Sequence, residues 1–307
     1  MKLNTRFLTR FLRMALCLFP ILCSLPTSRL AAQDMPLSQV LIDGEKWQLV
    51  SKGHQFTEGP AVDKNGNVFF TDVPRSKIYR VDAESMKVTV FVEKSFQTNG
   101  LMFGPDGKLY GCQNGQKQIV KFDSEGKATT VADNVECNDI AITRTGGIYF
   151  TDPSNRRVWY ISPQGKKRVV DEGLGFPNGV ILWPGQKTLV VADTRSLNLW
   201  AYRIEPDGSL KYKQPYYTMR GVRGRQGSGA DGMTVDRRGR LFVATYAGLQ
   251  MFDPTGRICG IILKPQERFL SNVVIGGKNR DTMFITCSDK VYRRKVKSRA
   301  LAVLLAK

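Results

Sequence analysis

A set of acidic and amide side chains recurs along the chain at nearly constant spacing. Each member opens a short apolar segment, and the intervals between members are 41, 39, 40, 53 and 41 residues. The six members are Glu58, Asn99, Asn138, Asn178, Asp231 and Asn272. Calcium takes six to eight oxygen ligands from carboxylates, amide carbonyls and water. If the fold brings these side chains together, the pattern predicts a site for one divalent metal, with calcium as the first choice.

Two further interpretations of this set stay open. Magnesium and manganese also accept oxygen ligands, whereas zinc prefers His and Cys, which the set lacks. Asn and Asp also favour turns, so the residues could simply cap strand starts. Capping explains the Asn-Gly pairs at Asn99 and Asn178, but it does not explain Glu58 before Gly59-Pro60.

Other residue types offer less catalytic chemistry. His54 is the only histidine, which excludes mechanisms that need two, and we expect it to be structural. Asp72, Asp152 and Asp193 lie 14 or 15 residues after members of the set. We expect them near the same end of the fold, bonding loop backbone rather than substrate. No serine lies in a G-x-S-x-G nucleophile elbow, which argues against a Ser–His–Asp triad.

The residues around the polar set repeat as a unit. Each copy reads as an apolar strand, a turn and a second strand rich in aromatic and β-branched residues, as in Glu58–Asp72; third and fourth strands follow, as in Lys77–Val81 and Val88–Val92. A period of roughly 40 residues with four short strands is typical of propeller blades. We therefore predict an all-β fold, a six-bladed β-propeller whose six polar residues meet at the mouth of the central channel. A β-sandwich is the alternative, but six copies at one period argue against it.

The two ends of the repeat array predict how the ring closes. The sixth copy lacks an outer strand after Val296, and residues 38–51 can supply it, which removes an open sheet edge. This places the propeller at residues 38–296 and leaves residues 297–307 as a basic C-terminal tail. The long interval of 53 residues reflects a longer segment over Tyr212–Gly229, which could overhang one face.

The first 32 residues predict export. Basic residues precede an apolar stretch over Met14–Pro26, and small residues follow at Ala31 and Ala32. This is typical of a cleavable secretory signal peptide, with a mature chain that begins near Gln33 in the periplasm or outside the cell. A short membrane anchor is the alternative. The apolar stretch falls below the roughly 18 residues of a span, so we expect no membrane span after cleavage.

Net charge and cysteine content narrow the partners. The formal net charge is +19, but the basic residues lie mainly at turns and near the C-terminus. We expect a solvated basic surface suited to acidic sugars or anionic envelopes, and no nucleic-acid partner. Four cysteines remain after cleavage, namely Cys112, Cys137, Cys259 and Cys287. Disulfides and buried free thiols both stay open, as does the oligomeric state.

These motifs resemble those of the gluconolactonase and regucalcin family, also called the senescence-marker-protein family. The resemblance covers residues 56–296 and is carried by Phe56-Thr-Glu-Gly-Pro60, Asn138-Asp139, Phe176-Pro-Asn-Gly179 and Ala230-Asp-Gly-Met233. It implies a six-bladed propeller that hydrolyses sugar lactones and related esters. It also implies a divalent metal held by Glu58, Asn138, Asn178 and Asp231.

The resemblance further implies how the site would work. The metal would polarise the lactone carbonyl, and Asp231 would be both a ligand and the candidate general base for water. Asn99 and Asn138 would face the substrate. Glu136 stands two residues before Asn138, where relatives often carry a basic or polar substrate-binding residue. The metal site therefore carries over better than the substrate, and a non-catalytic propeller that binds a glycan or a protein partner is the alternative.

Overall fold

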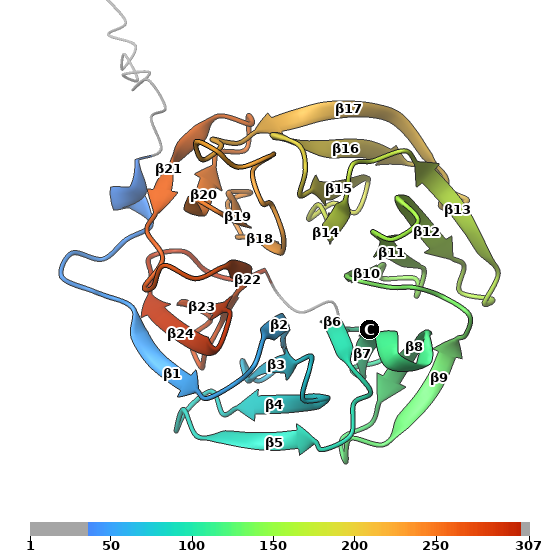
Figure 1. The fold of residues 1–307 in the computed structure, drawn as a ribbon, viewed down its shortest axis with the longest axis horizontal. Coiled ribbons are helices and arrows are strands. Elements are labelled where there is room, and N and C mark those ends of the chain that lie inside the picture. The colour runs from blue at the N-terminus through green and yellow to red at the C-terminus, as the bar shows by residue number, and fades with distance from the viewer. Residues whose placement is uncertain (1–35, 302–307) are drawn as a thin grey trace, which may run out of the picture. The chain divides into compact units, whose positions relative to one another are not determined.

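Six antiparallel sheets of four strands each surround a central channel in the computed structural model of the protein, which describes residues 36–301. Figure 1 shows the sheets as blades of a ring, with the first strand of each blade innermost. The prediction of an all-β, six-bladed propeller is confirmed. The predicted signal peptide, residues 1–32, lies outside the described residues. The helices within residues 36–301 are two short 3-10 turns, η1 (Leu37–Gln39) and η2 (Asn114–Gln116), and neither is long enough to cross a membrane.

The first three blades follow one another directly along the chain. Their strands are β2 (Thr57–Val62), β3 (Val68–Asp72), β4 (Lys77–Val81) and β5 (Val88–Val92); β6 (Thr98–Phe103), β7 (Leu109–Gln113), β8 (Gln118–Phe122) and β9 (Ala128–Ala132); and β10 (Ile140–Ile142), β11 (Ile148–Asp152), β12 (Arg157–Ile161) and β13 (Lys167–Glu172).

The last three blades complete the ring. Their strands are β14 (Pro177–Leu182), β15 (Thr188–Asp193), β16 (Asn198–Ile204) and β17 (Leu210–Thr218); β18 (Met233–Val235), β19 (Leu241–Thr245), β20 (Gly248–Phe252) and β21 (Ile258–Ile262); and β22 (Leu270–Gly276), β23 (Thr282–Cys287) and β24 (Lys290–Lys295), joined by β1 (Gln48–Lys52). The longer segment predicted in blade four divides into β17, the longest strand, and a loop over residues 219–232.

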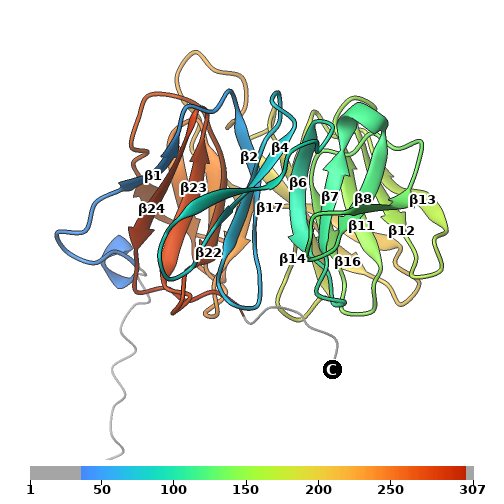
Figure 2. The same ribbon diagram turned by 90° about the horizontal axis from the view of Figure 1, so that it is seen from below.

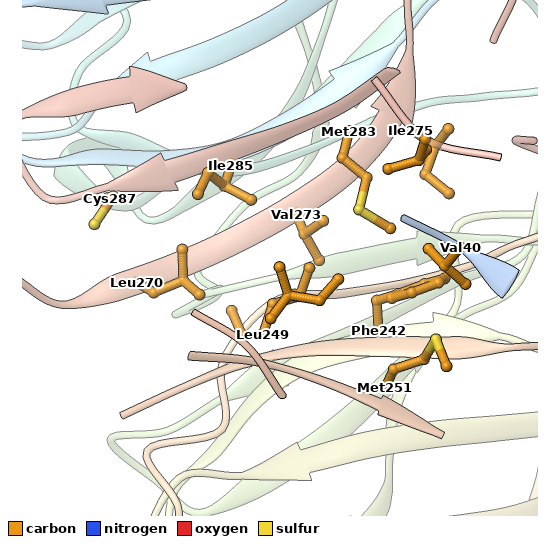
Figure 3. Packing of buried hydrophobic residues seen from close by; sticks show 13 residues of the cluster. Val40, Phe242, Leu249, Met251, Leu270, Val273, Ile275, Met283, Ile285 and Cys287 are labelled. Atoms are coloured by element: carbon orange, nitrogen blue, oxygen red, sulfur yellow. The ribbon is translucent and has the colours of Figure 1, made fainter. Parts of the chain in front are cut away.

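The N-terminal strand closes the last blade, as predicted. β1 pairs antiparallel with β24, with Gln48 opposite Arg293 and Lys52 opposite Lys290. The chain before β1 adds to this closure, because Lys297 N–H donates to the carbonyl of Val40 at 2.7 Å. Val40 is fully buried among side chains of blades five and six, including Phe242 and Met251 (Figure 3). The ring is therefore sealed by strand pairing and by apolar packing together.

The second strand of most blades is buried along its whole length. Every residue of β3, β7, β11 and β19 is buried, because each sheet is covered on both faces by its neighbouring blades (Figure 2). This explains the near-continuous apolar sequences, such as Val68-Phe-Phe and Leu241-Phe-Val-Ala. Each fully buried Val, Leu, Ile or Phe contributes about 1.5–3 kcal/mol, so the interfaces between blades supply most of the core.

The first residues of the predicted C-terminal tail pack against the propeller. Asp236 of blade five forms a β-bridge with Ala300. Buried Arg240 forms an ion pair with Asp236 at 2.6 Å and donates from Nη2 to the Ser298 hydroxyl at 2.9 Å. Residues 297–301 thus line blades five and six, and residues 302–307 lie outside the described part of the chain.

The cysteines divide into one pair and two free thiols. Cys112 at the end of β7 and Cys137 before β10 form a disulfide that joins blades two and three. Cys259 is half-buried and free, and Cys287 is buried and free. Both possibilities left open by the sequence therefore occur: two of the four cysteines form a disulfide, and the other two are free thiols.

Candidate active site

Strand register decides which residues meet at the mouth of the channel. Equivalent positions in four blades are set by the pairs Thr57–Asp72, Thr98–Gln113, Pro177–Asp193 and Leu270–Cys287. The next residue along each first strand is Glu58, Asn99, Asn178 and Ser271. Blade six therefore places Ser271 in the ring position, one residue earlier than the sequence pattern predicts. The Asn272 side chain still reaches the channel mouth, where it is hydrogen-bonded to Glu58.

Hydrogen bonds between blades support this register. The Gly100 N–H donates to the carbonyl of Asn138 at 2.9 Å, and the Gly232 N–H donates to that of Ser271 at 2.8 Å. Ser271 turns into the interface with blade one, where its hydroxyl donates to the carbonyl of Thr57 at 2.9 Å. The six residues of the ring position are thus Glu58, Asn99, Asn138, Asn178, Asp231 and Ser271.

The position after the ring residue is a glycine in four blades, and this makes room in the channel. A Cβ on Gly100 would lie 2.6 Å from Oδ1 of Asp139, and one on Gly232 would overlap the amide of Asn272. Asp139 and Asn272 are the two residues that take this position with a side chain, in blades three and six. No role for Asp139 was predicted from the sequence, although the repeat has an Asp here where four other blades have Gly.

Two buried carboxyl groups meet at the ring, and no Lys or Arg side chain of residues 36–301 forms an ion pair with either of them. Glu58 and Asp231 are buried, and their carboxyl groups are hydrogen-bonded to each other. Burial raises the pKa of both, and the charge of Glu58 raises that of Asp231 further. Asp139 lies close to both, and burial raises its pKa to about 6. Loss of solvation is expensive for charged carboxylates, so the arrangement favours a bound cation.

The amide of Asn178 supplies a free oxygen at the same place. Its Nδ2 lies 3.3 Å from the Thr194 hydroxyl and donates to it, while that hydroxyl donates to the carbonyl of Ala230 at 2.8 Å. This leaves Oδ1 of Asn178 buried with no hydrogen-bond donor. A buried polar oxygen without a partner is costly, and a hard cation would satisfy it. Asn99 and Asn138 complete the ring as half-buried side chains.

The residues present fit a divalent cation with oxygen ligands. Glu58 and Asp231 supply two carboxylates, and Asn138 and Asn178 supply amide oxygens, a donor set that suits calcium. Within residues 36–301, no three His, Cys, Asp or Glu side chains are grouped so as to hold a metal by themselves. A metal at this site would therefore need the amide oxygens of Asn138 and Asn178 in addition to the two carboxylates.

His54 lies outside this ring. Its Nε2 is 2.7 Å from the Ser51 hydroxyl, and its Nδ1 is 3.3 Å from Oδ2 of Asp72. The imidazole of His54 packs edge-on against Phe70 and Tyr79. Burial lowers the pKa of His54 below its ordinary value. The expected structural role is therefore the one that its contacts support.

The three aspartates after the ring hold the loops that lead into it. Asp72 accepts hydrogen bonds from the backbone N–H groups of Gln55 and Phe56, and Asp193 accepts them from Gly175 and Phe176. Asp152 is bonded to the side chains of Asn155 and Trp159. Asp152 also accepts a hydrogen bond from the backbone N–H of Asn155 at 3.1 Å. The expectation that these aspartates bond loop backbone is confirmed.

Behind the ring, the channel continues as a cavity. Its volume is about 230 Å³, and Asp139 and Asn272 lie on its wall together with apolar side chains such as Val62, Phe103 and Ile181. Leu301 of the C-terminal segment also lines it. Thr234 and Arg280 are further polar residues of this wall, and Asp139 is the carboxylate among the lining residues.

The fold and the oxygen-rich mouth of its channel together define the class of protein: a six-bladed β-propeller with a polar site at one end of the channel. Residues 56–289 match the family described as "SMP-30/Gluconolactonase/LRE-like region". The chain belongs to this family, which confirms the resemblance seen in the sequence.

Several relatives within and around this family are similar over most of the chain. It is 29% identical over 294 residues to the gluconolactonase of Zymomonas mobilis, covering 82% of this chain and 81% of that one. It is 27% identical over 252 residues to lactonase drp35 of Staphylococcus aureus, covering 73% and 74%.

Two solved structures show the same fold. A gluconolactonase of Xanthomonas campestris has a TM-score of 0.74 at 23% identity, covering 85% of this chain and 92% of that one. Regucalcin of Agrobacterium tumefaciens, a calcium-binding protein, also has a TM-score of 0.74, at 14% identity, covering 86% and 98%.

Proposed function

We propose that this protein is a lactonase that hydrolyses sugar lactones or related esters with the help of a divalent cation, calcium in the first place, held by Glu58, Asn138, Asn178 and Asp231. The observation that carries the proposal is Oδ1 of Asn178, which is buried without a donor beside two buried carboxyl groups. The gluconolactonase and drp35 relatives support the reaction class. The cation, when bound, would supply Lewis-acid chemistry at the lactone carbonyl.

The residues of the chain would handle the water and the proton. Asp231 is the candidate general base: it takes a proton as the water oxygen bonds to the carbonyl carbon. It then returns that proton to the ring oxygen as the ester C–O bond breaks, so the products are a hydroxyl and a carboxylic acid. Asn99 and Asn138, whose side chains are half-buried at the mouth, would bind the sugar hydroxyls. The narrow mouth of the ring would keep the lactone carbonyl and Asp231 together.

Two amide substitutions separate binding from catalysis. Glu58→Gln removes one anionic ligand, so it weakens metal binding, and excess calcium should restore most of the hydrolytic rate. Asp231→Asn removes both a ligand and the base, so the metal-loaded variant should stay about 10²–10⁴-fold impaired. The measurement is hydrolysis of glucono-1,5-lactone against calcium concentration, with bound metal quantified in parallel.

The matched control is Glu267→Gln, which changes an exposed carboxylate in the loop before β22. It should leave both metal content and rate unchanged. A metal-loaded Asp231→Asn variant with the wild-type rate would show that Asp231 is only a ligand. Retention of metal by both site variants would mean that the ring residues cap strands, and the non-catalytic propeller would then be the better description.

A further inference from the structure

The rim of the channel mouth is set by the residues two positions before the ring. These rim residues are Phe56, Gln97, Glu136, Phe176, Gly229 and Phe269. Four of these residues each stand one position before the first strand of their blade, namely Phe56, Gln97, Phe176 and Phe269. The rim therefore lies where the chain enters the ring of polar residues. At Gly229 the aromatic ring of Tyr246 fills the space of the missing side chain, since a Cβ on Gly229 would lie 2.5 Å from that aromatic ring. The rim is therefore aromatic over blades four, five, six and one.

Contacts among these aromatic side chains show that they form one surface. The Phe56 and Phe269 rings stack with centroids 6.3 Å apart, and Tyr246 meets Phe269 edge-on at 5.7 Å. All three are half-buried. Half-exposed aromatic side chains beside a polar site are suited to cover one face of a sugar ring.

Two arginines lie on this aromatic side of the rim. The Arg195 guanidinium carbon is 5.3 Å from the centroid of Phe176, and that of Arg225 is 5.2 Å from the centroid of Tyr246. Both side chains are exposed. No described carboxylate lies within 4.0 Å of either guanidinium, whereas Arg203 and Arg240 each pair with one.

The backbone holds these two arginines at the same side of the mouth. The loop that carries Arg225 is bonded to the chain around Arg195, because Ser228 N–H donates to Ser196 at 3.0 Å and Gly229 N–H donates to Thr194 at 3.1 Å. Phe176 and Gly229 stand two residues before Asn178 and Asp231. The two guanidiniums therefore flank the part of the ring that is contributed by blades four and five.

On blade three, which adjoins blade four, the rim residue is Glu136, whose charge is paired. Glu136 forms an ion pair with Lys117 at 3.1 Å, and that contact lowers the pKa of Glu136. An anionic substrate group there would have to compete with Glu136 for Lys117. A guanidinium on an aromatic face keeps its N–H edge free to bind a carboxylate or a phosphate through two hydrogen bonds.

We propose that Arg195 and Arg225 bind an anionic group on the substrate, so that the preferred substrates are lactones of sugar acids that carry a second acidic group. This inference rests on the proposed lactonase function and names its substrate class. A carboxylate and a phosphate share the chemistry that the two guanidiniums recognise.

The test compares one neutral and two anionic lactones. Wild-type kcat/KM should be at least about tenfold higher for D-glucaro-1,4-lactone, which carries a free carboxylate, or for 6-phosphoglucono-1,5-lactone than for glucono-1,5-lactone, because charge-assisted hydrogen bonds are the strong ones. The better of the two anionic lactones identifies the group. Arg195→Gln and Arg225→Gln should each lower the anionic value about tenfold or more and change the neutral value less than about twofold.

Arg223→Gln is the matched control, because Arg223 is exposed in the same loop as Arg225. It should leave all three values close to those of the wild type. Equal losses for neutral and anionic lactones in the Arg195 and Arg225 variants, or no preference in the wild type, would overturn the proposal.

A binding experiment separates this inference from the proposed function. Calorimetry should show tighter binding of D-glucarate, a dianion, than of D-gluconate, and the two arginine variants should lose that difference. If no lactone is hydrolysed but the difference is present, the lactonase proposal fails and the anion site stands. If lactones are hydrolysed without any arginine-dependent preference in rate or binding, the anion site is rejected and the lactonase proposal remains.

Discussion

At the scale of single residues, surroundings decide what each polar side chain can do. Asn178 and Asn198 are both asparagines of blade four. Asn198 is half-exposed and accepts a hydrogen bond from Thr218, whereas Asn178 is buried and its Oδ1 lacks a donor. The unmet oxygen, not the residue type, marks Asn178 as a candidate ligand.

His54 yields a prediction about pH, because it is the only histidine of the chain. Burial lowers its pKa from 6.5, and the nearby Asp72 carboxylate opposes this shift without cancelling it. The unfolded chain therefore binds a proton at higher pH than the folded protein does. Stability from this residue is complete above about pH 6.5 and is lost as the pH falls below that value, by about 1.4 kcal/mol for each unit of pKa difference.

Imidazole NMR on the metal-free protein measures the pKa of His54 directly. Urea unfolding between pH 7.5 and 5.5 then compares the wild type with His54→Gln, which should lack this contribution to the pH dependence. A measured pKa above 6.5 would show that the Asp72 carboxylate outweighs burial.

At the scale of elements, one disulfide lies next to a predicted ligand. Cys137 directly precedes Asn138, and its partner Cys112 lies in β7, the second strand of the preceding blade. The segment between β9 and β10 contains no other strand, so the disulfide anchors the backbone that presents Asn138.

The Cys112→Ala, Cys137→Ala double variant tests this anchoring. The two cysteines are 25 residues apart, and the chain-entropy model gives about 3 kcal/mol for closing a loop of this size. The free energy of unfolding should fall by about that amount, and calcium affinity should fall as well because Asn138 loses its anchor. Denaturant unfolding and calorimetric calcium titration are the measurements.

Cys259→Ala is the control, because Cys259 is free and half-buried. Unchanged calcium affinity in a double variant of reduced stability would confine the role of the disulfide to the fold. If the chain is exported, as residues 1–32 predict, this bond forms in an oxidising compartment, and thiol titration of the unfolded mature protein should find two free thiols.

At the scale of the whole molecule, the two ends of the chain close the ring together. β1 covers the outer edge of β24, and Arg240 joins Asp236 of blade five, the Ser298 hydroxyl and the carbonyl of Gln39. Loss of the N-terminal segment would expose the β24 edge and leave part of the buried ion pair open to water.

A chain that begins at Gly53 should therefore be less stable than one that begins at Met35. It lacks β1 and the packing of Val40, so we expect the Tm to fall by on the order of 10 °C and the exposed edge to promote association. Thermal unfolding and size-exclusion chromatography compare the two chains. Equal Tm and equal elution would show that three strands suffice for blade six.

Sequence patterns were enough to predict the propeller, its closure by residues 38–51 and five of the six ring positions. This was possible because alternation along a strand is a local pattern, and because the same pattern recurs in every blade. Glu58, Asn178 and Asp231 stand at the same place in their repeats, so their convergence follows from the repeat alone.

Features that depend on contacts between distant residues could not be predicted from the sequence. A register shift between Leu270 and Asn272 puts Ser271 in the ring, and no local pattern distinguishes the two choices. The pairing of Cys112 with Cys137 and the stacking of Arg225 on Tyr246 likewise arise between blades or across a long loop. Asp139 acquires its place only because glycines of other blades leave the channel open, a relation between residues that are neighbours in space and not in sequence.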